Sequence, residues 1–393
     1  MEEERLERLR GYLVEELGPE NAREDAVIMQ KITALVGEEH RKSPMTLAVR
    51  SRLAAELFAS VRGLGLLQEL LDDPEVTEIM VNGPERIFVE KDGKIRRWER
   101  SFPSEEKLMD LIRQVAGKCD RVINEQSPVV DARLADGSRV CAVVPPVALG
   151  GAVLSIRKFP KEPITLSELV RLGTIPGEAA DFLARLVRAG YSVLIGGGTS
   201  AGKTTFLNAL SACIPKDERI VTVEDNAELV LQGLENLVRL EAKSSNLEGA
   251  ADITIRDLVK ASLRMRPDRI VVGEVRGGEA VDLLQALNTG HEGSLSTIHA
   301  NSAEDMVSRL EMMVLMAFPL PLPAIRRQIA SGVDIFVFLK RHRDGKRRVV
   351  EIMETDGLFE DNVRLRPLFL WDAEDGRLRQ AGKLLHTEKL SRI

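Results

Sequence analysis

The stretch Gly197-Gly-Thr-Ser-Ala-Gly-Lys-Thr204 decides the fold, because it matches the phosphate-binding loop pattern G-x-x-x-x-G-K-[ST] in full. An apolar, β-branched run at 191–195 precedes it and predicts a buried strand. Residues 203–213 follow with helical spacing until Pro215 ends it. Glycines in such a loop turn successive backbone N–H groups toward an anion, at the positive end of the following helix. The sequence therefore predicts a strand, loop and helix that bind a polyphosphate.

The predicted nucleotide contacts are the loop residues and the start of the helix. They are Gly197, Gly198, Thr199, Ser200, Ala201, Gly202, Lys203, Thr204 and Thr205. In this pattern we expect Lys203 to contact the β- and γ-phosphates of ATP and Thr204 to bind Mg²⁺.

Composition limits the classes of protein that this chain can belong to. Its 393 residues are 44% hydrophobic and 30% charged, as expected for a globular protein of about two or three domains. A net charge of −6 argues against a dedicated nucleic-acid-binding protein. The three cysteines include no C-x-x-C pair, so we expect no zinc ribbon and no disulfide framework, and a reducing cytosol is the natural compartment.

Neither a signal peptide nor a membrane span is expected. The chain begins Met-Glu-Glu-Glu-Arg without an apolar segment. Its longest apolar stretch, 312–325, is interrupted by prolines and is too short to cross a bilayer. We therefore expect a cytoplasmic protein that reaches a membrane only through partners or surface contact.

The pattern along the chain predicts an α/β protein in four parts. Residues 1–60 are helical in pattern, as either a docking arm or a plain helical cap, and 61–158 suggest an α+β domain with an antiparallel sheet. Two prolines within 158–163 predict a linker over 159–175. Strands and helices alternate in 176–393, which indicates a mostly parallel sheet covered by helices.

Polar residues follow several strands predicted in this last part. The strand at 219–223 is followed by Glu224-Asp225, the strand at 269–273 by Glu274, and the strand at 293–298 by His299. Ligands of open α/β sheets bind beyond the carboxyl ends of the strands. Phosphoryl transfer needs Mg²⁺ and a group that orients the water. We expect Glu224 or Glu274 to polarise the water, with the acids, Asp225 and Glu274 among them, holding Mg²⁺ through water.

The histidines of this region support the same interpretation. His299 is expected to contact the γ-phosphate, and His291 lies close to it in the sequence, beside two glycines. Either histidine alone is more often structural, whereas both together after a phosphate loop favour a functional role.

Positive charge for the transition state is expected from Arg133, Arg139 and Arg157, on predicted strands of the preceding domain. Asp136-Gly137 predicts a hairpin with a two-residue turn. That turn would place Arg133 and Arg139 on opposite faces of the sheet, so that one serves its own subunit and the other a neighbour. The alternative is a solvated edge. A second hairpin, with a charged tip at Asp344-Gly345, is preferred to a nucleic-acid or lipid site in the basic run 340–348.

With these elements in order, the chain resembles the secretion (traffic) ATPases of the type II/IV superfamily, and more narrowly the CpaF-type ATPases of tight-adherence (Flp) pilus systems. The resemblance covers about residues 60–355. It is carried by Asp73-Pro-Glu-Val-Thr-Glu-Ile-Met-Val-Asn-Gly83, Val130-Asp-Ala-Arg-Leu-Ala-Asp-Gly-Ser-Arg-Val140, Val221-Thr-Val-Glu-Asp-Asn-Ala-Glu-Leu229, Gly273-Glu-Val-Arg-Gly277 and Thr289-Gly-His-Glu-Gly-Ser-Leu-Ser-Thr-Ile-His-Ala-Asn-Ser302, besides the phosphate loop.

This resemblance implies a RecA-like C-terminal domain, an N-terminal domain that folds over the nucleotide, and a homo-hexameric ring docked on inner-membrane platform proteins. Three departures matter. The tetracysteine zinc motif of pilus-extension and type II secretion ATPases is absent, which argues against that branch. Gly273-Glu274 replaces Asp-Glu and leaves open which glutamate is the base. Ser200-Ala201 stands where Gly-Ser is more familiar.

Three alternatives to a pilus motor stay open at this point. A type IV secretion ATPase that exports protein or DNA has nearly the same core motifs. A nucleotide-switched scaffold would bind ATP but barely hydrolyse it, which the presence of Glu224, Glu274 and His299 opposes. A DNA translocase is disfavoured by the acidic balance and by an aromatic content of only 4%.

Overall fold

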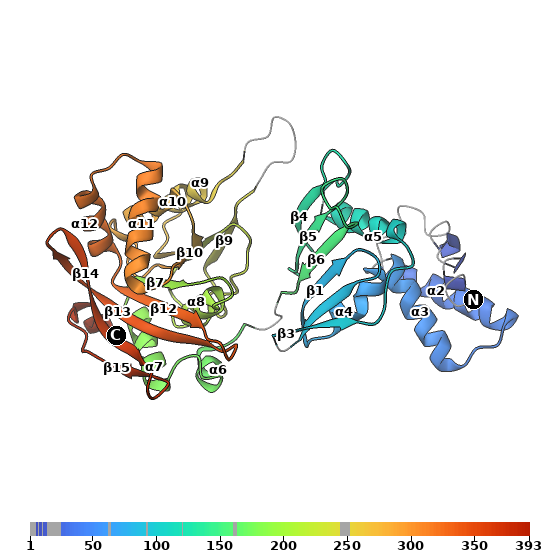
Figure 1. The fold of residues 1–393 in the computed structure, drawn as a ribbon, viewed down its shortest axis with the longest axis horizontal. Helices are drawn as coiled ribbons and strands as arrows, with labels where there is room; N and C mark the ends of the chain where they lie inside the picture. Colours follow the sequence, from blue (N-terminus) through green and yellow to red (C-terminus); the bar gives the residue numbers. More distant parts are fainter. Residues whose placement is uncertain are drawn as a thin grey trace. The chain divides into compact units, whose positions relative to one another are not determined.

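In the computed structural model, residue contacts divide the chain into two units, Met1–Pro160 and Lys161–Ile393 (Figure 1). The structure describes residues 5–6, 8–9, 11–13, 25–61, 64–91, 93–119, 121–159, 163–243 and 252–393. Parts of the predicted helical arm and of the predicted linker lie outside these residues. Among the described residues, no helix is both long and apolar enough to cross a membrane.

Unit 1 joins a helical segment to an antiparallel sheet. Its elements are α2 (Asp25–Lys42), α3 (Leu47–Val61), η1 (Gly65–Leu67), α4 (Gln68–Asp72), β1 (Val76–Asn82), β2 (Ile87–Lys91), β3 (Lys94–Trp98), α5 (Glu105–Lys118), β4 (Val129–Arg133), β5 (Arg139–Val143) and β6 (Val153–Arg157). The strands lie in the order β3-β2-β1-β6-β5-β4, and every neighbouring pair is antiparallel. The α+β prediction for this part is confirmed.

One face of this sheet is apolar because its strands alternate buried and exposed residues. Ile79 of β1 and Ile156 of β6 are paired and fully buried. They share a core with Leu108 and Ile112 of α5, so this helix covers the apolar face. The opposite face carries the polar members of the same strands.

Unit 2 is built around one large sheet. Its elements are α6 (Leu166–Arg171), α7 (Gly177–Arg188), β7 (Val193–Gly197), α8 (Lys203–Ser211), β8 (Ile220–Glu224), β9 (Leu237–Glu241), α9 (Ile255–Ser262), β10 (Arg269–Val275), α10 (Glu279–Leu287), β11 (Leu295–His299), α11 (Ala303–Ala317), α12 (Leu322–Gly332), β12 (Ile335–Arg341), β13 (Arg347–Phe359), β14 (Asn362–Asp372), β15 (Arg377–Gln380) and η2 (Glu388–Arg392). The strand order is β15-β14-β13-β12-β7-β11-β10-β8-β9.

The six strands from β12 to β9 run parallel, and β13–β15 extend the sheet as an antiparallel meander. The predicted mostly parallel, RecA-like sheet is therefore confirmed. The predicted hairpin at Asp344-Gly345 joins β12 to β13, with Gly345 in a left-handed conformation at φ +81°. β7 lies between β12 and β11, which puts the phosphate loop in the middle of the sheet.

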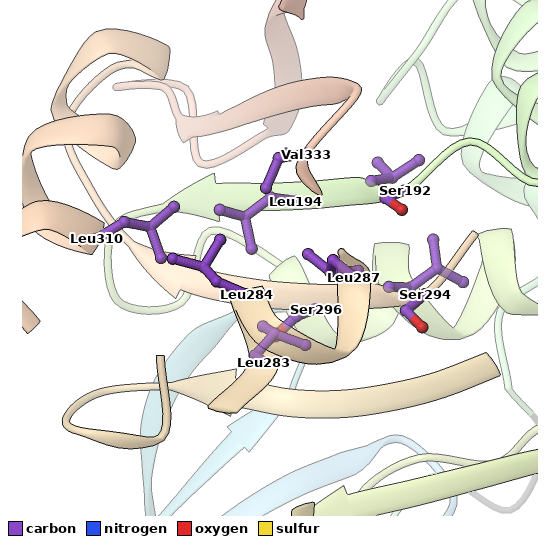
Figure 2. Close-up of a pocket in the computed structure, with 11 residues that line it drawn as sticks. Ser192, Leu194, Leu283, Leu284, Leu287, Ser294, Ser296, Leu310 and Val333 are labelled. Carbon is purple, nitrogen blue, oxygen red and sulfur yellow. The ribbon is translucent and has the colours of Figure 1, made fainter. Parts of the chain in front are cut away.

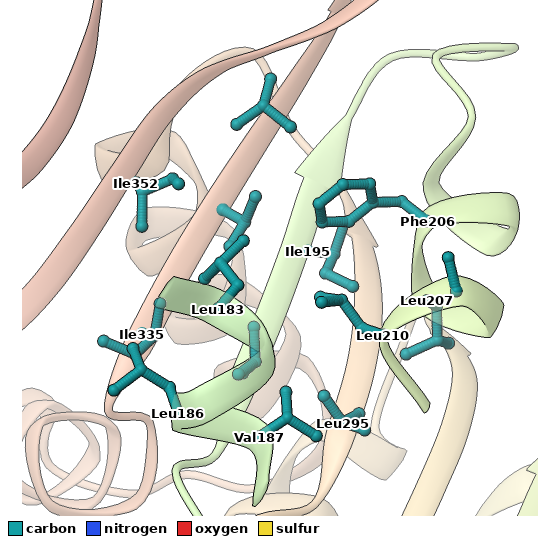
Figure 3. Close-up of a cluster of buried hydrophobic side chains, with 14 of the residues drawn as sticks. Leu183, Leu186, Val187, Ile195, Phe206, Leu207, Leu210, Leu295, Ile335 and Ile352 are labelled. Atoms are coloured by element: carbon teal, nitrogen blue, oxygen red, sulfur yellow. The ribbon is translucent and has the colours of Figure 1, made fainter. Parts of the chain in front are cut away.

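Helices cover both faces of this sheet. α9–α12 pack over one face, and α7 and α8 pack over the other. Figure 3 shows side chains of α7 and α8 meeting the strands: Leu183, Leu186, Val187, Phe206, Leu207 and Leu210 face Ile195, Leu295, Ile335 and Ile352. Burying each large aliphatic side chain stabilises the fold by about 1.5–3 kcal/mol. The sheet and α8 therefore hold the phosphate loop at both of its ends.

The structure differs from the predicted linker at 159–175. Residues 166–171 form α6, and Leu169 is buried in the core of unit 2. Thr165 caps this helix, because its hydroxyl accepts a hydrogen bond from the Glu168 N–H. The prolines nearby concealed this short capped helix from the sequence interpretation.

Candidate active site

The phosphate loop follows β7 and ends where α8 begins, as its sequence predicts. Gly202 stands at the N-cap of α8 with φ +91°, a left-handed conformation that glycine adopts without strain. Ser200 is also left-handed, at φ +59°, although it has a side chain. Thr204 and Thr205 lie in the first turn of α8, directly after Lys203.

Lys203 lies at the centre of the site. Its side chain is 8% exposed, and Nζ donates to the Gly198 carbonyl at 3.3 Å. The same nitrogen lies 3.5 Å from Oε1 of Glu274 and 3.4 Å from Nδ1 of His299. Burial lowers the pKa of Lys203, and the nearby Glu274 carboxylate opposes that shift. The ammonium group is thus held among polar neighbours close to the loop.

Glu274 and His299 reach Lys203 from the carboxyl ends of β10 and β11. His299 Nε2 lies 3.0 Å from Glu274 Oε1. Burial lowers the pKa of His299, partly offset by Glu274. This shift favours the neutral ring, which can donate one hydrogen bond while it accepts another.

Arg276 is a residue of this site that the sequence interpretation missed. Its Nε donates to Glu274 Oε2 at 2.7 Å, and its Nη1 lies 3.3 Å from Asp225 Oδ2. The guanidinium thereby links Asp225, which follows β8, to Glu274 near the end of β10. The available signal was its place in Gly273-Glu-Val-Arg-Gly277, two residues after Glu274.

Glu224, at the end of β8, is held differently from Glu274. It is 2% exposed, and its Oε1 accepts hydrogen bonds from the backbone N–H groups of Glu228 and Leu229, both at 2.8 Å. Its Oε2 is buried with no hydrogen-bond partner among the described residues. Burial raises the pKa of Glu224 to about 7, although the two backbone hydrogen bonds act to lower it.

Gly273 explains the departure from Asp-Glu in the acidic motif. A Cβ at this position would lie 2.9 Å from Cγ of Glu224, closer than such atoms pack. Glycine therefore leaves the space that the Glu224 side chain occupies, beside the strand that carries Glu274.

These acids also bear on the predicted Mg²⁺. Among the described residues, no group of three or more His, Cys, Asp or Glu side chains is placed to hold a metal ion directly. Asp225 and Glu274 are the two carboxylates that Arg276 links. They suit the water shell of a Mg²⁺ ion bound chiefly by phosphates and Thr204, since Mg²⁺ usually keeps several waters.

His291 does not belong to this site. It lies before β11, at the opposite end of that strand from His299, with Nδ1 3.3 Å from the Ala286 carbonyl. The proximity of the two histidines in sequence was misleading, because a whole strand separates them.

A small cavity also lies away from the site, between α10 and strands β7 and β11 (Figure 2). Its volume is about 10 Å³, far below that of a ligand pocket. Side chains from helices and strands line it, namely Ser192, Val193, Leu194, Leu283, Leu284, Leu287, Ser294, Leu295, Ser296, Leu310 and Val333. We assign it to imperfect packing.

The predicted arrangement of the unit 1 arginines was wrong. Arg133 pairs directly with Arg139, and Arg139 pairs with Arg157. The hairpin turn has three residues, with Gly137 left-handed at φ +89°, and a bond from Leu134 N–H to the Ser138 carbonyl closes it. One extra residue shifts the register by one, so all three arginines lie in a row on the same face. Their catalytic role stays a prediction.

Comparison with known proteins identifies the family. A family model described as type II/IV secretion system protein matches residues 61–356. The chain belongs to this family. A putative conjugal transfer protein of Mycobacterium tuberculosis is 38% identical over 84% of this chain and 94% of its own length. The type IV secretion system protein PtlH of Bordetella pertussis is 38% identical over 75% of this chain and 95% of its own length.

Two solved structures have a similar fold. The pilus retraction motor PilT with bound ADP has a TM-score of 0.54 at 20% identity, covering 84% of this chain and 86% of its own. The ATPase DotB of Legionella pneumophila has a TM-score of 0.52 at 21% identity, covering 73% of this chain and 79% of its own. At these identities the likeness supports the fold alone.

Proposed function

We propose that this secretion-family protein is a Mg²⁺-dependent ATPase that acts as a homo-hexameric ring on the cytoplasmic face of an inner membrane. The observation that carries the proposal is the convergence of Lys203, Glu224, Glu274 and His299 beyond the carboxyl ends of neighbouring strands. A phosphate loop with its lysine and an acid that can orient the attacking water are groups that phosphoryl transfer uses.

Each residue has a proposed part. Lys203 and the loop N–H groups bind the phosphates. Mg²⁺, when bound with ATP, would neutralise phosphate charge. Thr204 would hold the ion directly, and Asp225 and Glu274 would hold it through water molecules. His299 contacts the γ-phosphate. Glu224 takes the proton from the attacking water. Two observations support this role: its Oε2 has no hydrogen-bond partner among the described residues, and its pKa is raised to about 7.

The arginine row of unit 1 is the proposed source of additional positive charge. Arg133, Arg139 and Arg157 share a face of the sheet opposite α5. Arg133 is partly engaged, since its Nε donates to the Gly137 carbonyl at 3.0 Å. Because the three lie side by side, one polyphosphate can meet more than one of them, in its own subunit or in a neighbour.

For the biological task we propose assembly of a tight-adherence (Flp) pilus, on the sequence motifs that resemble CpaF-type ATPases. A second candidate, export of protein or DNA by a type IV secretion system, is favoured by the names of the relatives at 38% identity. Deletion of the gene distinguishes the two. Loss of surface pili with intact export supports the pilus motor, and the reverse result supports secretion.

The test of the enzymatic proposal is ATPase activity per molecule with Mg²⁺ across a wide range of protein concentration. We expect activity to rise steeply and then saturate, because sites completed between subunits need the ring. An Arg139→Ala variant should lower the plateau. No Mg²⁺-dependent hydrolysis at any concentration, despite ATP binding, would instead favour a nucleotide-switched scaffold.

A further inference from the structure

Arg347, the first residue of β13, lies against the phosphate loop although 147 residues separate it from Ser200. Its Nε donates a hydrogen bond to the Ser200 carbonyl at 3.0 Å. Its aliphatic part passes close to Gly202, where a Cβ would lie 3.1 Å from Cδ of Arg347. The side chain thus runs along the loop from one left-handed residue to the other.

Ser200 is the loop residue that most needs such support. Its φ of +59° is a conformation that residues with a side chain rarely adopt. The peptide that Arg347 holds is the one directly after Ser200, and the N–H of that same peptide donates from Ala201 to the Gly198 carbonyl at 3.3 Å. Arg347 therefore fixes a peptide plane inside the anion-binding loop, from outside the loop.

The charge around Arg347 also favours an anion at this place. The register of β12 and β13 sets Arg341 directly opposite Arg347, and like charges at such positions repel. Arg348, the next residue, is neutralised by Asp344 at 2.6 Å. Arg347 instead donates to an uncharged carbonyl. Its positive charge is thus held beside the loop, where the phosphates of a nucleotide would offset it.

We propose that Arg347 is a positioning residue of the active site, which holds the Ser200 carbonyl and so keeps the phosphate loop in the shape that binds a nucleoside triphosphate. This inference rests on the proposed ATPase function. It also gives the basic hairpin of β12 and β13 a role that does not involve nucleic acid.

The experiment is a titration of a fluorescent ATP analogue, together with steady-state ATPase kinetics, on the full chain. Arg347→Ala should weaken analogue binding and raise KM about tenfold, with kcat changed by less than about twofold. Arg341→Ala is the matched control, because it removes an equal charge from the opposite strand, and it should bind within about twofold of the wild type.

Glycine at position 200 provides the decisive variant. Glycine adopts a left-handed conformation freely, so the loop of Ser200→Gly should no longer depend on Arg347. The double variant Arg347→Ala with Ser200→Gly should bind the analogue within about threefold of Ser200→Gly alone. If Arg347 only stabilised the fold, a substitution in the loop would not restore binding of the analogue to the Arg347→Ala variant.

Three outcomes overturn the inference: wild-type affinity in Arg347→Ala, equal weakening in Arg341→Ala, or no rescue by Ser200→Gly. Failure of the wild type itself to bind the analogue would overturn the proposed function as well. Failure of the Arg347 inference can therefore be distinguished from failure of the proposed ATPase function. If Arg347→Ala does not fold, Arg347→Lys keeps the charge without the Nε–H donor and carries the same predictions.

Discussion

The two ends of the parallel strands in unit 2 use similar side chains in opposite ways. At the amino ends, Asp334 accepts hydrogen bonds from the Ser192 N–H and the Lys389 ammonium, both at 2.7 Å, and the Tyr191 hydroxyl donates to the His386 carbonyl. At the carboxyl ends, Glu224 keeps a buried oxygen without a partner among the described residues.

This contrast separates groups that serve folding from groups that await a ligand. Buried polar atoms are normally hydrogen-bonded, and those that are not need an explanation. At the amino ends, a backbone N–H group and a lysine of the chain itself donate hydrogen bonds to the buried acid. The carboxyl ends crowd Lys203, Glu274 and His299 together and hold Ser200 in a left-handed conformation. An unpaired buried oxygen and a left-handed residue with a side chain thus both occur where a nucleotide is proposed to bind.

The largest expected effect comes from removing the proposed base. Glu224→Gln keeps an oxygen that can accept from Glu228 and Leu229, so the fold should persist. Turnover should fall about 10²–10⁴-fold, the usual contribution of a general base. In the wild type, kcat should drop as pH falls through about 7, because protonated Glu224 cannot accept a proton.

Glu274→Gln is the matched control for the pH profile. It too should lower activity, because it disturbs Lys203 and Arg276, but the decline near pH 7 should persist in its residual activity. Should that decline persist in Glu224→Gln and vanish in Glu274→Gln, the base is Glu274.

The same acid predicts how stability depends on pH. The pKa of Glu224 is raised from its ordinary value of 4.5 to about 7, so between these values the folded chain keeps a proton that the unfolded chain loses. The free energy of unfolding should therefore decrease as pH rises from about 4.5 to about 7, by about 3 kcal/mol from this group. Denaturant titrations without nucleotide should show a smaller decrease in Glu224→Gln. Parallel pH curves for the two proteins would contradict the raised pKa.

Lys203→Ala should lose charge-assisted phosphate contacts worth about 1.5–3 kcal/mol, which is about 10–100-fold in ATP affinity. Its stability should not suffer in proportion, because burial already disfavours the charged lysine and lowers its pKa. Calorimetric titration with ATP measures the affinity, and thermal unfolding provides the control. Unchanged nucleotide binding would refute the loop assignment.

Asp334→Ala tests the other end of the strands. It leaves the Ser192 N–H and the Lys389 ammonium without their acceptor, which should cost about 1–3 kcal/mol of stability. ATPase activity per folded molecule should stay near that of the wild type. A large loss of kcat with unchanged stability would break the distinction between the two ends.

The smallest effect is expected from Tyr191→Phe, which deletes the hydroxyl that donates to the His386 carbonyl. We expect a loss of about 0.5–1.5 kcal/mol in the free energy of unfolding. Burial raises the pKa of Tyr191 to about 12, so the hydroxyl is protonated at all ordinary pH values. The loss should consequently be the same at pH 6 and pH 9 in paired denaturant titrations.

Most of the fold could be predicted from the sequence, and so could the positions of several site residues, because their signals are local. The phosphate loop, its strand and its helix follow from contiguous residues, and Glu224, Glu274 and His299 follow from strand ends. Contacts set by tertiary packing could not be predicted in this way. Arg276 lies in the motif Gly273–Gly277, but the motif does not specify which acids its side chain contacts, and Arg347 lies in no motif at all.

The hairpin of Arg133 and Arg139 shows a different limit. Asp136-Gly137 suits a two-residue turn, yet the left-handed Gly137 serves a three-residue turn equally well. The choice between them moves a side chain to the other face of the sheet. Sequence alone located the hairpin, whereas the structure was needed to assign its faces.

The close approach of Glu224 to Gly273 links two positions that lie on neighbouring strands. A relative that carries aspartate at the position of Gly273 has to place the acid of the adjoining strand elsewhere. Motifs of such relatives can then not be exchanged one at a time. A chimera that imports Asp-Glu into this chain needs a compensating change at Glu224, so the two strands have to be exchanged together.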